Sequence, residues 1–351
     1  MLSIELLKKQ KLFNPDADDS KSTIIGGSTT NLLYLAEAKY PWAKNLWQTL
    51  RSNFWGMEKI NLTNDLATYK NLTEAESNAY NGILSYLIFL DSIQTNNIPT
   101  LGQYITNPEI TMCLGEVTAQ EILHSFSYQT VLESAVPPEV VDNIYYFWKD
   151  DEVLRERCEY IASLYQKNID EPTIDNFIQT LMADLLLEGL YFWVGFYYFY
   201  GLSARGLMMG TADTIKLIQR DEQTHIYLFK NMLSDTFKLL PKGEVELYKN
   251  KFKKMADEAV EKEIAWWHHI VGNEILGFSK NSIAEFVKHK AYINIYKPFS
   301  LPCDFSDAKN TLKHLELIAG LDDNGSNKGN FFESTLGDYQ HVQLSKEDAE
   351  W

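Results

Sequence analysis

Two occurrences of the pattern Glu-x-x-His constrain this chain more than any other feature of its sequence. They are Glu121 to His124 in AQEILHSF and Glu222 to His225 in QRDEQTHI, and both lie in stretches that favour helix. Residues three apart share one face of a helix, so a carboxylate and an imidazole at this spacing can reach the same metal ion while the backbone stays helical. Each pair therefore predicts one half of a metal site.

A lone carboxylate precedes each pair. Asp91, in YLIFLDSIQ, lies 30 residues before Glu121, and Glu188, in LLLEGLYFW, lies 34 residues before Glu222. Each separation fits one helix, a connection and part of the next helix. Both acids lie in apolar surroundings, where a carboxylate is rare unless it is paired or binds a metal. Four helices would supply four carboxylates and two imidazoles, the ligand set of ferritin-like di-iron and di-manganese bundles, with one Asp in place of a Glu.

The ligand chemistry indicates the kind of metal. Carboxylates with imidazoles suit iron and manganese, whereas a structural zinc site would favour thiolates. The cysteines Cys113, Cys158 and Cys303 are widely spaced and form no C-x-x-C pair. They are typical of reduced thiols in a cytoplasmic protein. We expect two metal ions per chain, with iron favoured and manganese as the alternative.

A single Glu-x-x-His is weak evidence, since a solvent-exposed helix face gives the same string. The remaining histidines have no Glu three residues earlier and are interpreted as ordinary side chains: His268, His269, His289, His314 and His341. Asp338 and His341 have similar spacing, but they lie in a polar segment and are not assigned a metal. Only both pairs together with both lone acids predict a dinuclear centre.

The rest of the chain is helical in pattern. Alternating strand patterns and Gly-rich phosphate loops are absent from the sequence, so we predict one all-α domain, a ferritin-like helical bundle. The expected helices are marked by a capping box at Thr73 and Glu76 before Asp91, a start at Asn107-Pro108 with an end at Pro137-Pro138, a run from near Pro172 to Gly201, a cap at Thr211, and stretches near 244–272 and 279–296.

One apolar stretch, residues 181–202, is long enough to resemble a membrane span, which needs about 20 apolar residues. It carries Asp184 and Glu188, and each acid would cost roughly 2.5 to 3.5 kcal/mol near the middle of a bilayer. We therefore predict a central helix buried on all sides and no membrane partner. The formal net charge of −16 argues against a nucleic-acid partner.

The chain divides into three expected parts: an N-terminal extension at 1–28, a helical domain at 29–320 and a C-terminal tail at 321–351. The N-terminus shows no signal-peptide pattern. It also has no room for an added regulatory nucleotide-binding module, so allosteric control would reside in a partner. The tail is polar, acidic and rich in Gly, Asn and Ser, which predicts flexibility.

Tyr128 lies four residues after His124 on the same helix face. Helical side chains lean toward the N-terminus, so its phenol should point back at the metals. Phe192, Phe196 and Ile218 stand at helical spacings from the lone and paired acids and would form an apolar pocket. Taken alone, a tyrosine at the Tyr128 spacing is more often part of an ordinary core, and the other three residues are equally typical of one.

Four segments together resemble the small, radical-generating subunit of class I ribonucleotide reductase: FLDSIQ, EILHSFSY, LEGLYFWVGF and LIQRDEQTH. The similarity extends from about Phe54 to Tyr339. It implies that the metal ligands are Asp91, Glu121, His124, Glu188, Glu222 and His225. It also implies a stable radical on Tyr128, with Phe192, Phe196 and Ile218 as its apolar pocket.

The resemblance further implies a route for the radical. Trp55, in NFWGME, matches a tryptophan that is joined to a ligand histidine through the aspartate of the R-D-E motif, here Asp221. In NFFESTLGDY, a glutamate is followed six residues later by a redox tyrosine, and these positions are Glu333 and Tyr339. From its spacing alone, Asp221 could simply orient His225.

The partners expected from the resemblance are proteins. Trp55, Asp221 and Tyr339 would carry the electron and proton to a larger catalytic subunit, which binds the C-terminal tail and makes deoxyribonucleotides. The small subunit is expected to be a homodimer in the cytoplasm. A flavodoxin-like activator would be needed if the metal is manganese.

Two other functions use the same ligands. A ferritin-like di-metal oxidase or monooxygenase would have its own substrate pocket and no use for Trp55, Asp221 and Tyr339. A metal-storage bundle is usually much shorter and does not need aromatic residues around its metals. Asp91 and Tyr128 argue against the reductase variant with a manganese–iron pair, and the ending SKEDAEW fits an acidic tail that binds a partner.

Overall fold

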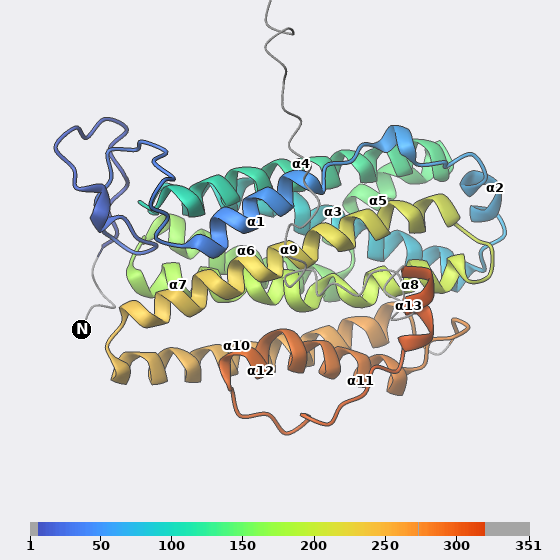
Figure 1. Ribbon diagram of the computed structural model, residues 1–351. Coiled ribbons are helices and arrows are strands. Elements are labelled where there is room, and N and C mark those ends of the chain that lie inside the picture. Colours follow the sequence, from blue (N-terminus) through green and yellow to red (C-terminus); the bar gives the residue numbers. More distant parts are fainter. Residues whose placement is uncertain (1–5, 273, 320–351) are drawn as a thin grey trace, which may run out of the picture.

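The protein is a bundle of helices in the computed structural model, which describes residues 6–272 and 274–319 (Figure 1). The longest helices are α3 (Glu74–Gly102), α4 (Pro108–Ala135), α9 (Met209–Leu239) and α10 (Lys242–Ile270). The shorter ones are α1 (Pro41–Ser52), α2 (Asp65–Tyr69), α5 (Pro138–Asp150), α6 (Glu152–Asp170), α7 (Ile174–Leu186), α8 (Trp193–Ser203), α11 (Lys280–Ala291), α12 (Lys297–Phe299) and α13 (Glu316–Ala319). The predicted all-α, ferritin-like class is confirmed.

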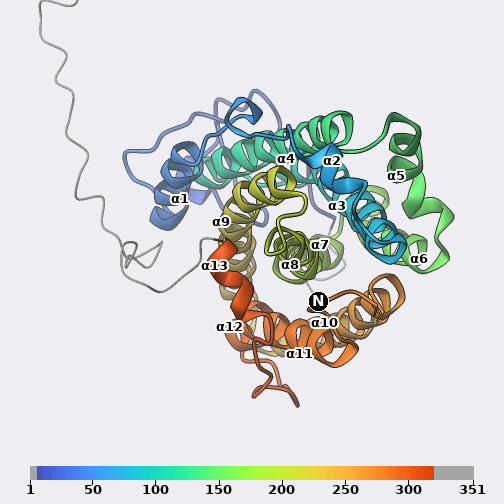
Figure 2. The ribbon, with the colours of Figure 1, turned by 90° about the vertical axis from the view of Figure 1, so that its right-hand side faces the viewer.

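A buried helical rod runs through the middle of the bundle. It consists of α7, a π-helical turn at Leu187–Tyr191 (η4) and α8, and the other helices surround it when the bundle is viewed end-on (Figure 2). Every residue from 181 to 200 is buried. The apolar window within Ile174–Ser203 that could cross a membrane by length and composition is 94% buried inside the protein. This burial agrees with the predicted core helix.

The capping residues predicted for α3 and α4 form hydrogen bonds at the N-termini of these helices. Glu76 donates its backbone N–H to the Thr73 hydroxyl at 3.2 Å, and Thr73 returns its own N–H to the Glu76 carboxylate at 3.0 Å. The Asn107 side chain accepts the backbone N–H of Ile110 at 3.1 Å. These side chains satisfy N–H groups that a helix leaves open in its first turn.

The predicted cap of α9 is wrong. Thr211 lies inside the first turn, and the cap comes from another helix. The buried carboxylate of Asp65 in α2 accepts the backbone N–H of Gly210 at 3.0 Å and that of Thr211 at 2.7 Å, together with the Thr211 hydroxyl at 2.8 Å. A carboxylate at the N-terminus of a helix accepts hydrogen bonds from the free N–H groups there. Its negative charge also interacts favourably with the positive end of the helix dipole.

The structure gives boundaries that the sequence left open. The helix that carries Asp91 continues to Gly102, so this acid lies in the middle of α3. The segment after Pro138 forms α5 and α6, which were not assigned from the sequence. Irregular chain extends to Tyr40 before α1, so the division at residue 29 stays a prediction. The predicted tail at 321–351 lies outside the described residues.

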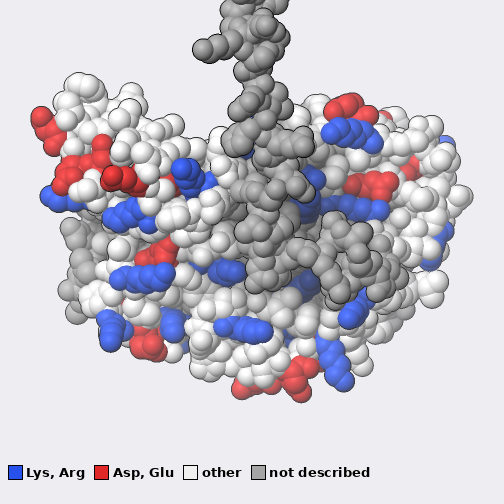
Figure 3. All heavy atoms as spheres, in the orientation of Figure 1, with Lys and Arg blue, Asp and Glu red and all other residues white. Residues whose placement is uncertain are grey.

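Charged side chains of both signs mix on the face shown in Figure 3. Lys and Arg are interspersed there with Asp and Glu, so this face is not uniformly acidic despite the formal net charge of −16. A group of acids instead lies in the interior, and none of its members is exposed: Asp91, Glu121, Asp184, Glu188, Asp221 and Glu222. Their burial calls for compensating positive charge.

Candidate metal centre

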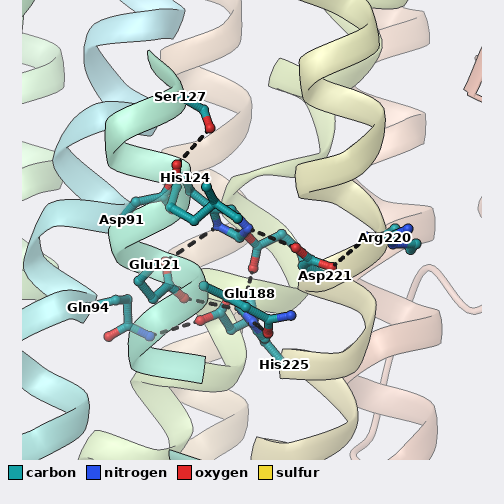
Figure 4. Close-up of polar contacts among 12 residues, drawn as sticks. Asp91, Gln94, Glu121, His124, Ser127, Glu188, Arg220, Asp221 and His225 are labelled. Carbon is teal, nitrogen blue, oxygen red and sulfur yellow. Dashed lines mark hydrogen bonds and ion pairs between the residues drawn. The ribbon is translucent and has the colours of Figure 1, made fainter. Parts of the chain in front are cut away.

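Six of the side chains selected from the sequence meet in the middle of the bundle (Figure 4). Helix α3 contributes an aspartate, α4 and α9 each contribute a Glu-x-x-His pair, and η4 contributes a glutamate. All six are fully buried: Asp91, Glu121, His124, Glu188, Glu222 and His225. Four elements that are distant in sequence therefore present their ligand-type atoms to one point.

The six residues form two overlapping groups of four. Within each group, one potential ligand atom per residue lies within 4.8 Å of all the others. The first group contains Asp91 and His124, the second contains Glu188 and His225, and Glu121 and Glu222 belong to both. Carboxylates shared in this way are suited to bridge two ions. The arrangement is that of a dinuclear site, although metal binding by these residues stays a prediction.

Both imidazoles turn their Nδ1 atoms toward the carboxylates. Nδ1 of His124 lies 3.0 Å from Oε1 of Glu222. Nδ1 of His225 lies 2.8 Å from Oε2 of Glu222 and 3.2 Å from Oε1 of Glu121. The Nδ1 atoms are thus the ring nitrogens placed to bind metal.

The second ring nitrogen of each imidazole, Nε2, contacts a side-chain oxygen from the other of the two helices α4 and α9. Nε2 of His124 lies 3.3 Å from Oδ2 of Asp221, and Nε2 of His225 lies 3.0 Å from Oε1 of Gln120. Oxygen acceptors at these positions favour a proton on Nε2, which leaves the Nδ1 lone pair free for a metal. Asp221 therefore orients His124, not the His225 on its own helix that its spacing suggested.

Sequence reasoning missed Gln120. Gln120 and Asp221 each come immediately before the Glu of a Glu-x-x-His pair. This shared register is the signal that would have found Gln120, because equivalent positions of the two helices face each other across the site.

A tryptophan continues the line outward from the site. Nε1 of Trp55 donates to Oδ2 of Asp221 at 2.7 Å, the same oxygen that faces His124. The Trp55 ring also stacks over the His124 ring, with centroids 6.2 Å apart and planes at 24°. The structure thus places Trp55, Asp221 and His124 in mutual contact in the interior, and a radical route through them stays a prediction.

The cluster shifts the pKa values of its own members. Burial and the charge of Glu121 raise the pKa of Asp91 well above its usual range. Burial and the charge of Glu222 do the same to the pKa of Glu188. Burial also acts to raise the pKa of Glu222, but the two adjacent imidazoles outweigh it and lower that pKa. Repulsion of this kind among buried carboxylates is relieved when cations bind between them.

The residues present fit a pair of divalent ions. Four ionised carboxylates carry four negative charges, which two divalent ions would balance. Polar atoms of the cluster lie close to one another but form no hydrogen bond of proper geometry among the described residues, a costly state for buried groups unless a ligand satisfies them. These atoms are both carboxylate oxygens of Asp91, Glu121 and Glu222, Oε2 of Glu188, and Nδ1 of His124 and His225. An oxygen-rich set with two imidazoles suits iron or manganese.

Glu188 is held by a chain of amides that the sequence did not reveal. Nε2 of Gln94 donates to Oε1 of Glu188 at 2.9 Å. Nδ2 of Asn97 donates to Oε1 of Gln94 at 3.0 Å and to Oδ1 of Asp184 at 2.8 Å. Gln94 follows Asp91 by one helical turn, which would have placed it on the same face. The chain fixes one oxygen of Glu188 and leaves the other toward the site.

Tyr128 is buried at the Asp91 side of the site. Burial and the charge of Asp91 raise the pKa of its phenol well above the ordinary value, so it is protonated. Phe192 and Phe196 stack with centroids 5.5 Å apart, and they are fully buried, as is Ile218. Their contact with Tyr128 stays a prediction. Tyr339 and Glu333 lie outside the described residues.

Two cavities among the described residues are lined by none of the six candidate ligands. A cavity of about 160 Å³ reaches Trp55, Gln120 and Asp221, and none of the six candidate ligands lines it. A larger cavity of about 460 Å³ lies between the N-terminal segment and the ends of α7 and α9, away from the site. Sites for small-molecule substrates usually measure about 300–1,000 Å³. Neither of these two cavities forms a substrate pocket at the six residues.

Comparison with known proteins gives a consistent family. Residues 33–292 match the family described as "Ribonucleotide reductase, small chain". The chain is 38% identical over 291 residues to the ribonucleoside-diphosphate reductase subunit beta of Treponema pallidum, covering 82% of this chain and 83% of the relative. It is 32% identical over 346 residues to the subunit beta of Halalkalibacterium halodurans, covering 97% of each.

Solved structures agree. The ribonucleotide reductase R2 subunit from Clostridium botulinum superposes with a TM-score of 0.84 at 34% identity, covering 90% of this chain and 99% of that one. The dimanganese(II)-NrdF of Streptococcus sanguinis superposes with a TM-score of 0.73 at 19% identity, covering 83% and 99%. The second likeness is one of fold alone.

Proposed function

This chain belongs to the family of ribonucleotide reductase small chains, and we propose that within this enzyme it generates and stores a radical on Tyr128 for a larger catalytic subunit. The proposal rests on two features that occur together in the middle of the bundle. Two overlapping ligand groups share Glu121 and Glu222, and a buried line from His124 through Asp221 to Trp55 leads away from them. A storage or self-contained oxidase site would not need that line.

Two metal ions per chain occupy the centre in this proposal. Their ligands are Asp91, Glu121, His124, Glu188, Glu222 and His225. When bound, the ions supply redox chemistry with dioxygen, by which Tyr128 loses one electron and one proton. Iron is the favoured metal, with manganese as the alternative, and a flavodoxin-like activator would serve the manganese form. The Streptococcus sanguinis neighbour is described as a dimanganese protein.

The surroundings of Tyr128 suit a long-lived radical. The side chain is 1% exposed, so water and dissolved reductants cannot approach the ring. Asp91 is the acid whose charge acts most strongly on the phenol, and in this proposal its carboxylate takes the phenolic proton. Without that acceptor, loss of an electron from a buried phenol would leave a positive charge in a medium of low dielectric.

The line behind His124 serves the transfer to the partner. Trp55 can lose an electron while its Nε1 proton transfers to Oδ2 of Asp221 along the hydrogen bond of 2.7 Å, so that no charge is left on the ring. Tyr339 of the tail is the next residue on the route. It gives an electron and a proton toward Trp55 and then takes an electron and a proton from the large subunit. Ribonucleoside diphosphates are then reduced on that subunit, in the cytoplasm.

A homodimer forms through the outer face of α4 in this proposal. Gly115, Ala119, Ile122 and Phe126 follow one another at helical spacing along that face, and all four are exposed. Ile122 is 53% exposed, Phe126 is 57% exposed, and Phe54 beside α4 is 73% exposed. An exposed apolar stripe with small residues at one end suits close packing against the same stripe of a second copy.

Metal content and electron paramagnetic resonance test the central step. Protein loaded anaerobically with Fe(II), or with Mn(II) and the activator, should hold two ions per chain, and Glu121→Ala should lower this number. Oxygen exposure should give a tyrosyl signal that Tyr128→Phe abolishes without loss of metal. Tyr80→Phe, at another buried tyrosine, is the control and should keep the signal. A tyrosyl signal that persists in Tyr128→Phe would contradict the assignment.

A further inference from the structure

A buried lysine lies against a tryptophan beside the metal centre. Lys290 in α11 is 6% exposed and is the only buried lysine of the described ranges. Its ammonium lies 3.8 Å from the centroid of the Trp193 ring, and the Phe286 and Tyr197 rings follow at 5.4 and 5.5 Å. Lysine is rarely buried without a specific interaction, and here the faces of aromatic rings surround the charge.

Trp193 is attached directly to the element that carries Glu188. Its indole N–H donates to the backbone oxygen of Glu188 at 3.0 Å, across the π-helical turn η4. The ring is 4% exposed. An easily oxidised side chain therefore stands one hydrogen bond from a candidate ligand, and the proposed route to the partner does not include it.

The two tryptophans beside the centre have opposite electrostatic surroundings. Trp55 donates its N–H to the carboxylate of Asp221, a base that can take the proton when the ring loses an electron. Trp193 donates its N–H to a peptide carbonyl, which is a far weaker base, and an ammonium faces its ring. Oxidation of Trp193 would create a radical cation beside an existing positive charge in a region of low dielectric, which Coulomb repulsion disfavours.

We propose that Lys290 is a specificity-determining residue, whose positive charge prevents oxidation of Trp193 and so reserves the oxidising equivalent for Tyr128. The inference rests on the proposed radical function. In the suppressed side reaction the Trp193 ring would give one electron to the metal centre and a second to dioxygen. Addition of water with release of two protons would then leave hydroxytryptophan.

The charge state of Lys290 supports this role. Burial lowers its pKa to about 8, and the charge of Glu316 at the start of α13 acts in the opposite direction. The side chain is thus mostly an ammonium at neutral pH. The other buried cation, Arg157, differs because it directly contacts the carboxylate of Glu263, which compensates its charge.

Variants at position 290 separate charge from packing. Lys290→Met keeps most of the volume and removes the charge, whereas Lys290→Arg keeps the charge. Each is loaded anaerobically with Fe(II) and exposed to oxygen. The Tyr128 radical per chain is measured by electron paramagnetic resonance, and oxygen addition at Trp193 is measured by peptide mass spectrometry. Thermal unfolding and metal content are recorded for every sample.

In Lys290→Met we expect the yield of the Tyr128 radical per chain to fall about threefold or more, and we expect Trp193 to gain an oxygen atom. Wild type and Lys290→Arg should keep the radical and an unmodified Trp193. The double variant Lys290→Met/Trp193→Phe should recover the radical, because the competing electron donor is gone, and a purely structural role for Lys290 predicts no such recovery. Lys290→Gln replaces Lys290→Met in the series if the latter does not fold.

An unmodified Trp193 with a wild-type radical yield in the neutral variants would overturn the inference, as would equal losses in the Arg and Met variants. The proposed function has its own readout in the same experiment. If wild type forms no Tyr128 radical, that function fails, whereas the oxygen content of the Trp193 peptide still decides the role of Lys290.

Discussion

Asp184 shows what burial in this bundle does to a single carboxyl group. It stands at the far end of the amide chain from Glu188, and burial raises its pKa to about 8. In the unfolded chain an aspartate has a pKa of about 3.9. Between these two values the folded protein holds a proton that the unfolded chain has released. The free energy of unfolding therefore decreases as the pH rises from about 4 to about 8.

Replacing this group by a neutral amide should remove that pH dependence. Asn at position 184 can still accept the N–H of Asn97 through its carbonyl oxygen. We expect Asp184→Asn to gain stability relative to wild type by up to about 1.4 kcal/mol for each pH unit between about 4 and 8. Chemical denaturation of metal-free protein at several pH values measures the difference. A difference that does not change with pH would contradict the assigned pKa.

The sequence could reveal the residues that recur at a fixed helical spacing. The six acids and imidazoles at the centre repeat along helices at fixed intervals, and the structure brings all of them together. Gln120, Gln94 and Asn97 were missed because amide side chains occur at any position of a polar helix face. Position along the helix could have selected Gln120 and Gln94. The residue that each amide holds, however, depends on what stands opposite on another helix, and the sequence does not give the register between helices.

At the scale of elements, α9 depends on a carboxylate that lies 145 residues earlier in the chain. Long apolar helices with nearby caps, such as α3 and α4, were predicted because their signals are local. The cap of α9 was not, because Asp65 acts across the bundle. The π-helical turn at Leu187–Tyr191 was also missed, since one extra residue in a helical turn leaves the apolar pattern of a fully buried rod unchanged.

Removal of the distant cap should destabilise the fold. Asp65→Ala leaves the buried N–H groups of Gly210 and Thr211 without their acceptor, so we expect a loss of roughly 2 kcal/mol or more in the free energy of unfolding. Asp213→Ala is the matched control. Asp213 also lies near the start of α9, but its side chain is 52% exposed and forms an ion pair with Lys216. It should cost less than about 1 kcal/mol. Equal effects of the two variants would rule out the capping role of Asp65.

At the scale of the whole molecule, the exposed stripe of α4 should decide the oligomeric state. A charge placed in an apolar interface is costly to bury, so Ile122→Glu/Phe126→Glu should convert dimers to monomers while the metal content stays unchanged. Leu247→Glu on α10 is the matched control, since Leu247 is 64% exposed and outside this stripe. Light scattering coupled to size-exclusion chromatography measures the mass. Dimers that survive the double change would move the interface to another face.

The C-terminal tail should separate radical formation from radical use. The helical bundle holds the six candidate ligands and Tyr128, and these lie between residues 91 and 225, far in sequence from Tyr339. Tyr339→Phe keeps the ring but removes the phenolic proton. It should therefore leave metal content and the Tyr128 signal unchanged, while nucleotide reduction with saturating large subunit falls to almost nothing.

Truncation of the last residues through Trp351 should fail differently. It removes part of the acidic segment that is expected to bind the large subunit, so activity should fall through weaker association and recover in part with excess partner. Activity titrated against large-subunit concentration distinguishes the two variants, because only the truncation should shift the half-saturating concentration. Full activity of Tyr339→Phe at saturating partner would take this residue out of the pathway and leave Trp55 as the last assigned position on the route.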